Sequence, residues 1–106
     1  MNKKPEVDIG PRDKEILSSL LKQYLPDTAI WVHGSRVKRD AKRSTGAQPW
    51  SDLDLVVFTG TEQKYQLSLL REALEESNLT FRVDLMEWNS LPENFKANIK
   101  SSYAEL

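Results

Sequence analysis

The stretch Ser51-Asp52-Leu53-Asp54-Leu55-Val56-Val57-Phe58 decides how this sequence folds and where its chemistry lies. Its apolar run is typical of a buried strand, and successive side chains of a strand point to opposite faces. Asp52 and Asp54 therefore project from one face, while Leu53 and Leu55 project from the other. Two carboxylates held this close require a cation, and Mg²⁺ takes oxygen ligands while leaving positions open for phosphates. The pair points to phosphoryl or nucleotidyl transfer.

On its own, an Asp-x-Asp pair fits equally well a solvated strand start, so its neighbours along the chain decide between the two interpretations. Upstream, an apolar run ends in His33-Gly34-Ser35-Arg36. Downstream, Phe81–Met86 alternates apolar and polar residues and carries a third carboxylate, Asp84, on its polar face. Three predicted strands that each carry polar residues of this kind favour a functional site over a chance arrangement.

Length and composition set the class of protein. The 106 residues, of which 39% are hydrophobic and 29% charged, predict one domain over residues 1–106 with a single core and a loose terminus at residues 1–10. No apolar stretch is long enough to span a bilayer, and no apolar run follows the first lysines, so we expect neither a membrane segment nor a signal peptide. The absence of cysteine excludes disulfides and thiolate chemistry and agrees with a cytoplasmic location.

Periodicity and turn residues predict an alternation of helices and strands. In the first half of the chain we expect a helix from Pro11 to Pro26, a strand from Ala29 to His33, a short helix that Ser35 caps and that runs to about Ala41, and a loop from Lys42 to Trp50. In the second half we expect a strand from Asp52 to Thr59, a helix from Glu62 to Ser77 and a strand at Phe81–Met86. A terminal helix follows a capping box at Ser90–Glu93 and carries Phe95, Ile99 and Tyr103. This order predicts an α/β domain in which helices flank a small sheet. Periodicity leaves the strand order open.

The polar residues of the three strands match what nucleotide transfer from ATP requires. Gly34 lets the backbone approach a phosphate, and Ser35 adds a hydroxyl and the N–H groups of the helix that it is expected to cap. Asp52 and Asp54 are candidate Mg²⁺ ligands. Asp84 is a candidate third metal ligand and the general base that activates the attacking hydroxyl.

Basic residues cluster immediately after the Gly-Ser turn. Five of the 15 lysines and arginines lie between Arg36 and Arg43. The other basic residues of this cluster are explained by a solvated helix face. Arg36 is a candidate phosphate ligand, and a position on the surface of a helix explains it equally well. His33 is interpreted as a structural residue at a strand end. A nucleic-acid-binding domain would depend on this cluster alone, so we expect no direct nucleic-acid binding.

Together, Val32-His33-Gly34-Ser35-Arg36, Ser51-Asp52-Leu53-Asp54-Leu55 and Arg82-Val83-Asp84-Leu85 resemble the minimal nucleotidyltransferase family of the polymerase β superfamily. The resemblance implies a polymerase-β-like fold with a mixed sheet. It also implies an antitoxin that transfers AMP from ATP, with Mg²⁺ as cofactor, to a tyrosine of a partner HEPN-domain toxin ribonuclease with which it forms a hetero-oligomer. On this resemblance Gly34 and Ser35 hold phosphates, and Asp52, Asp54 and Asp84 bind the metal.

The sequence leaves a second function open, and it differs from the usual family pattern in the spacer between Ser35 and Asp52. A non-catalytic antitoxin that neutralises the toxin by stoichiometric binding would carry the same residues without using them. The sixteen residues from Arg36 to Ser51 form a longer spacer than is usual in the family, and a surface loop tolerates such an insertion. From its size we also expect the chain to lack the extra domain with which larger nucleotidyltransferases hold an antibiotic or an RNA end, so a macromolecular substrate fits better.

Overall fold

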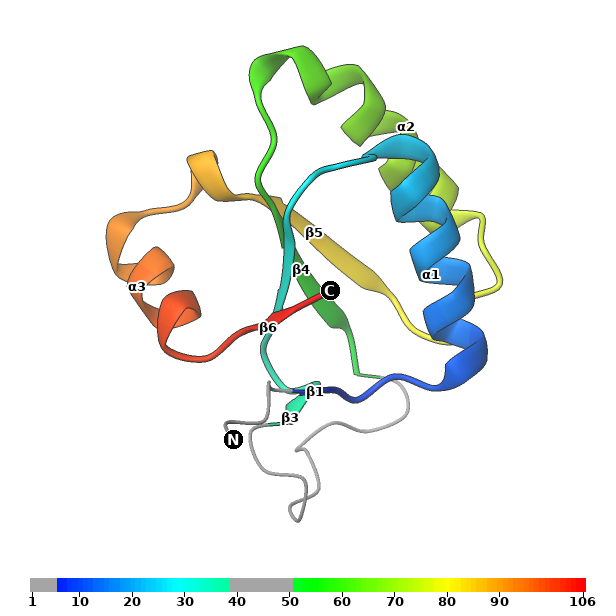
Figure 1. Cartoon of the computed structure of the whole chain (residues 1–106), viewed down its shortest axis with the longest axis horizontal. Coiled ribbons are helices and arrows are strands. Elements are labelled where there is room, and N and C mark those ends of the chain that lie inside the picture. Colours follow the sequence, from blue (N-terminus) through cyan, green and yellow to red (C-terminus); the bar gives the residue numbers. More distant parts are fainter. Residues whose placement is uncertain (1–5, 39–50) are drawn as a thin grey trace.

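The computed structural model describes residues 6–38 and 51–106, which form a sheet with helices on both sides (Figure 1). In chain order its elements are β1 (Glu6–Val7), α1 (Pro11–Tyr24), β2 (Ile30–His33), β3 (Val37–Lys38), β4 (Leu53–Val57), the short 3₁₀ helix η1 (Thr61–Gln63), α2 (Lys64–Glu75), β5 (Val83–Glu87), the 3₁₀ helix η2 (Trp88–Ser90), α3 (Glu93–Ser101) and β6 (Ala104–Glu105). Among the helices of these residues, none is long and apolar enough to cross a membrane.

The main sheet is mixed, with strand order β5-β4-β2-β6. Strands β4 and β5 run parallel and are joined through α2, which supplies the long crossover that a parallel pair needs. Strand β2 is antiparallel to both β4 and β6. A separate small ladder pairs β1 with β3. The predicted α/β class with a small mixed sheet flanked by helices is confirmed.

The core lies between this sheet and the two long helices, α1 and α2, which Figure 1 shows on the same side of it. The leucines at helical spacing in α1 and α2 meet Leu53, Leu55 and Val57 of β4, all of which are fully buried. Helix α3 lies on the opposite side of the sheet (Figure 1). Because side chains alternate along β4, Asp54 and Val56 project toward that second side.

An aromatic cluster lies next to α3, whose Lys96 and Lys100 approach the ring of Trp88. Tyr103 stacks on Trp31 with ring centroids 3.8 Å apart and an interplanar angle of 15°. Phe58 and Trp88 complete the cluster, with their centroids 4.6 Å and 5.5 Å from that of Trp31. Tyr103 was expected within the terminal helix, but it follows the end of α3 and leads into β6, a strand that the sequence did not predict.

Two predicted local structures are wrong. No helix follows Ser35: the chain turns at residues 34–36 and enters β3, which pairs with β1, so part of the expected loose terminus is ordered by that ladder. The capping box at Ser90–Glu93 does not form, because the residue that caps α3 is Pro92 and no side chain caps the helix. The predicted loop from Lys42 to Trp50, the far end of the helix predicted after Ser35, and residues 1–5 lie outside the described residues.

Candidate active site

Three polar side chains lie in one row across the sheet, on the side that faces α3. His33 of β2 is the register partner of Asp54 of β4, and Asp54 is the register partner of Asp84 of β5. Register partners project from the same face, and neighbouring strands lie about 4.8 Å apart. We call His33, Asp54 and Asp84 the carboxylate row. Asp52, one residue before β4, is exposed and two positions from Asp54, so it flanks the row on the same face.

The centre of the row is partly desolvated. Burial raises the pKa of the Asp54 carboxyl, and the like charges of Asp84 and Asp52 raise it further, against the opposing effect of His33. Burial also lowers the pKa of His33, in spite of the two neighbouring carboxylates. The Nε2 atom of His33 is buried and makes no hydrogen bond within the described part of the chain. The site thus holds an ionisable carboxyl where water is partly excluded.

The Gly34-Ser35 turn closes over Asp54. Gly34 has φ of +86°, a conformation that residues with a side chain rarely adopt. A Cβ atom built on Gly34 would overlap the Oδ2 atom of Asp54, so only glycine lets the turn approach the carboxylate this closely. Ser35 follows in the turn and is exposed. The two motifs that the sequence analysis singled out, Gly-Ser and Asp-x-Asp, therefore meet in space.

Arg36 has a different location from the one predicted for it. Its side chain is buried with 6% exposure, Nε donates to the backbone oxygen of Ser51 at 3.0 Å, and Nη1 donates to that of Asp8 at 2.9 Å. The guanidinium lies 4.3 Å from the ring centroid of Phe81. It therefore connects the residue before Asp52 with the segment that leads into β5. The predicted phosphate contact stays a prediction that this geometry does not favour.

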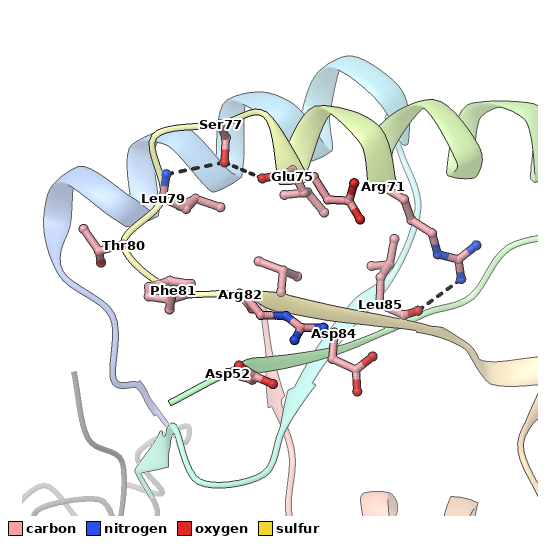
Figure 2. Close-up of a pocket in the computed structure, with 12 residues that line it drawn as sticks. Asp52, Arg71, Glu75, Ser77, Leu79, Thr80, Phe81, Arg82, Asp84 and Leu85 are labelled. Carbon is pink, nitrogen blue, oxygen red and sulfur yellow. Dashed lines mark hydrogen bonds between the residues drawn. The ribbon is translucent and has the colours of Figure 1, made fainter. Parts of the chain in front are cut away.

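A groove of about 680 Å³ runs between the C-terminal half of α2 and β5 and reaches the site (Figure 2). Leu74, Leu79 and Val83 line it toward α2, and Asp52 and Asp84 line it at the carboxylate row. The guanidinium of Arg71, shown at one end of the view in Figure 2, donates from Nη2 to the backbone oxygen of Leu85 at 3.1 Å. The carboxylates are thus reachable along the outer edge of β5.

The donor atoms at this site are carboxylate oxygens, which suit hard divalent cations such as Mg²⁺. Among the described residues, no three histidine or carboxylate side chains converge into a ready-made cation site. Mg²⁺ does not need such a cage, because in nucleotide-dependent proteins it is held by one or two carboxylates together with substrate phosphates and water. Asp52 and Asp54, with Asp84 beside them, offer carboxylate oxygens of this kind on one face.

Two residues that lie near the site, His33 and Arg71, are not among the candidates selected from the sequence. His33 was interpreted as structural, although its position immediately before the Gly-Ser turn was a signal that it would stand beside Asp54. Arg71 was not singled out, because a lone arginine on the exposed side of a helix carries no signal in a single sequence. Its contact with the edge of β5 depends on how α2 packs over the sheet.

Comparisons with known proteins agree with this arrangement. Residues 15–106 match the family described as "Polymerase beta, Nucleotidyltransferase". The chain is 35% identical over 99 residues to the "Probable protein adenylyltransferase MntA" of Haemophilus influenzae, an alignment that covers 92% of this chain and 82% of that protein. A crystal structure of a nucleotidyltransferase candidate, 16% identical, matches with a TM-score of 0.50 over 92% of this chain and 99% of its own. At that identity the likeness shows the fold alone.

Proposed function

The chain belongs to the minimal nucleotidyltransferase family of the polymerase β superfamily, and from this membership we propose that it transfers AMP from ATP to a tyrosine of a HEPN-domain toxin, acting as its antitoxin. The name of the Haemophilus influenzae relative, a protein adenylyltransferase, supports a protein acceptor. The observation that carries the proposal is the carboxylate row: Asp54 and Asp84 are cross-strand partners, and the Gly34 turn closes against Asp54.

The chain's own residues fit the parts of this reaction. Asp52 and Asp54 would hold Mg²⁺, which, when bound, offsets phosphate charge and makes the α-phosphorus more electrophilic. The turn at Gly34 and Ser35 is exposed, and Gly34 lies against Asp54, so the backbone N–H groups of the turn and the Ser35 hydroxyl would be available to a triphosphate bound there. Arg36 contributes indirectly, since its hydrogen bond to Ser51 positions the segment that carries Asp52.

The transfer step can be written with its atoms balanced. The acceptor's hydroxyl oxygen forms a bond to the α-phosphorus of ATP, the bond from that phosphorus to the bridging oxygen breaks, and pyrophosphate leaves. Asp84, which is exposed beside Asp54 at the mouth of the groove, accepts the proton of the hydroxyl and releases it to water. Because Asp54 and Asp84 are partners on neighbouring strands of the sheet, a proposed metal ligand and the proposed base are positioned before the substrate arrives.

The test uses the full chain, ATP, Mg²⁺ and, as the candidate acceptor, a HEPN-domain protein from the same organism, with intact mass as the readout. We expect the mass of the HEPN protein to increase by whole AMP units with the wild-type chain and to stay unchanged with Asp52→Asn/Asp54→Asn. The matched control is Glu72→Gln/Glu76→Gln, which removes two exposed carboxylates near the end of α2. Withholding Mg²⁺ with EDTA should abolish the transfer as well.

The same experiment separates the catalytic antitoxin from one that only binds. If the double aspartate variant protects RNA from the toxin as well as the wild type does, and no AMP appears on the partner, then neutralisation is stoichiometric and the proposed transfer is wrong.

A further inference from the structure

Strand β5 forms one edge of the main sheet within the described residues, and its backbone pattern can be deduced from two hydrogen bonds. The N–H of Leu53 donates to the carbonyl of Arg82 at 2.8 Å, so the backbone groups of Arg82 point toward β4. The carbonyl of Leu85 instead accepts from Arg71, on the side of the groove. Backbone groups of successive residues in a parallel strand point to opposite sides. The N–H and C=O of Val83 and the N–H of Leu85 therefore face the groove.

We infer that this edge of β5 binds an extended segment of the protein acceptor as an added strand, which places a hydroxyl-bearing residue opposite Asp84. The inference rests on the proposed function, whose acceptor is a protein. An edge strand with outward N–H and C=O groups is a template for such pairing, and backbone hydrogen bonds then supply affinity. The segment of the acceptor that binds here is thus recognised by its extended backbone and by one hydroxyl group.

The register of the sheet explains why this edge suits the chemistry. His33, Asp54 and Asp84 already form a row across three strands. A residue of an added strand that lies opposite Asp84 becomes the fourth member of the row, on the same face and about 4.8 Å away along the sheet. Its hydroxyl is then next to the base that the proposed function assigns.

The lining of the groove adds two properties of the docked segment. Residues on either side of the hydroxyl-bearing one project to the other face, where Leu74 and Leu79 line the groove together with Glu75 and Ser77, so we expect side chains there that combine an apolar part with a polar group. Arg71 already occupies the carbonyl of Leu85. The free part of the edge is therefore short, from Val83 to the N–H of Leu85, and only about three residues of the acceptor can pair with it.

The opposite edge of the sheet provides a built-in control. In β6, the N–H of Leu106 donates to the carbonyl of Ile30 at 3.0 Å. Because Trp31 and Glu105 are the next partners in this antiparallel ladder, the N–H of Glu105 points outward. A segment paired there would be separated from Asp84 by the width of the sheet. Both edges thus offer an outward N–H, but only β5 offers it beside the carboxylate row.

The test removes a single outward N–H group. Incorporation of α-hydroxyisovaleric acid at position 83 replaces the amide by an ester and keeps the side chain of Val83, while the α-hydroxy analogue of glutamate at position 105 is the control. With the same HEPN-domain protein as acceptor, we expect the KM for that protein to rise roughly tenfold for the ester at 83. The KM for ATP and the control ester should stay at wild-type values. Val83→Pro, which also removes the N–H, should behave like the ester.

The possible failures are distinguishable. If the wild type labels the acceptor and the ester at 83 has the wild-type KM, the edge-docking inference is wrong while the proposed function stands. If the wild type labels no protein, the proposed function is wrong, and hydrogen exchange decides about the edge. Adding the same HEPN protein to Asp52→Asn/Asp54→Asn should then slow exchange at the amides of Val83 and Leu85, and unchanged exchange at both overturns the inference.

Discussion

The α-carbon of Gly34 lies so close to the carboxylate of Asp54 that a methyl group on it would overlap Oδ2. This contact joins the turn after β2 to the centre of the carboxylate row. It also gives a reason for the glycine that differs from the one suggested by the sequence: there is no space for a Cβ atom beside Asp54. From the sequence, Gly34 was expected to let the backbone approach a phosphate, whereas in the structure the group that lies against it is a carboxylate of the chain itself.

Gly34→Ala tests this contact. We expect the free energy of unfolding to fall by about 1–3 kcal/mol, because alanine is strained at a φ of +86° and its Cβ displaces Asp54. AMP transfer should fall at least roughly tenfold, since a shift of a metal ligand of about 1 Å has effects of that order or larger. Urea unfolding and initial rates check both. Gly10→Ala is the control for activity: a Cβ atom there meets open space, and alanine only makes a poorer N-cap for α1, so AMP transfer should stay at the wild-type rate. A comparable loss of transfer in Gly10→Ala would refute the explanation.

Asp54→Asn should abolish transfer and yet stabilise the metal-free protein at pH 7. The pKa of Asp54 is raised in the folded state, chiefly by burial, so folding favours the protonated carboxyl. Its stabilising contribution is present below the unfolded pKa near 3.8 and is lost as the pH rises through the folded pKa. Asp54→Asn should therefore raise the free energy of unfolding at pH 7, and this increase should shrink as the pH approaches 4. Urea unfolding in EDTA measures it, with Glu72→Gln as control. If Asp54→Asn is less stable than the wild type at pH 7, the expected increase in the free energy of unfolding is wrong.

The stack of Tyr103 on Trp31 should hold the segment after α3 on the sheet. Tyr103→Ala removes a half-buried ring whose centroid is 3.8 Å from that of Trp31, and we expect a loss of about 1–3 kcal/mol in the free energy of unfolding. Tyr103→Phe keeps the ring and should stay within about 0.5 kcal/mol of the wild type. Chemical unfolding followed by tryptophan fluorescence compares the two variants. Equal stabilities for alanine and phenylalanine would show that the stack contributes nothing.

Features that depend on a local residue pattern could be predicted from the sequence, whereas features that depend on residues distant in the chain could not. The alternation of Leu53, Asp54 and Leu55 is local, so it correctly indicated a strand with one apolar face. The helices were found through their leucine spacing for the same reason. Strand β6 is only two residues long and has no period of its own, and it forms because β2 offers an edge to pair with. Such pairing is invisible to periodicity.

The differences near the site between the predicted and the observed structure have a similar cause. Ser35 resembled a helix cap, but the positive φ of Gly34 redirects the chain into β3, whose partner lies near the start of the sequence. Arg36 resembled a phosphate ligand because it follows the Gly-Ser pair. Its burial depends on Ser51 and Phe81, which are distant in sequence, so no local pattern could reveal it.

Arg36 therefore offers the sharpest comparison between the interpretation from sequence and the one from structure. Arg36→Ala leaves the carbonyls of Ser51 and Asp8 without this donor and removes the contact with Phe81, so we expect a loss of about 2–4 kcal/mol in the free energy of unfolding. Arg36→Lys keeps the charge but lacks the planar fork that reaches both carbonyls, and should also be destabilised.

The control is Arg12→Ala on the exposed surface of α1, whose stability should match that of the wild type within about 0.5 kcal/mol. Unfolding in urea and the KM for ATP are measured on the same preparations. A positioning residue lowers stability and the transfer rate together, and because Arg36→Lys preserves the charge, it should not rescue either. A phosphate ligand instead leaves stability unchanged and raises the KM for ATP. That second result would restore the prediction made from the sequence and contradict the location described for Arg36.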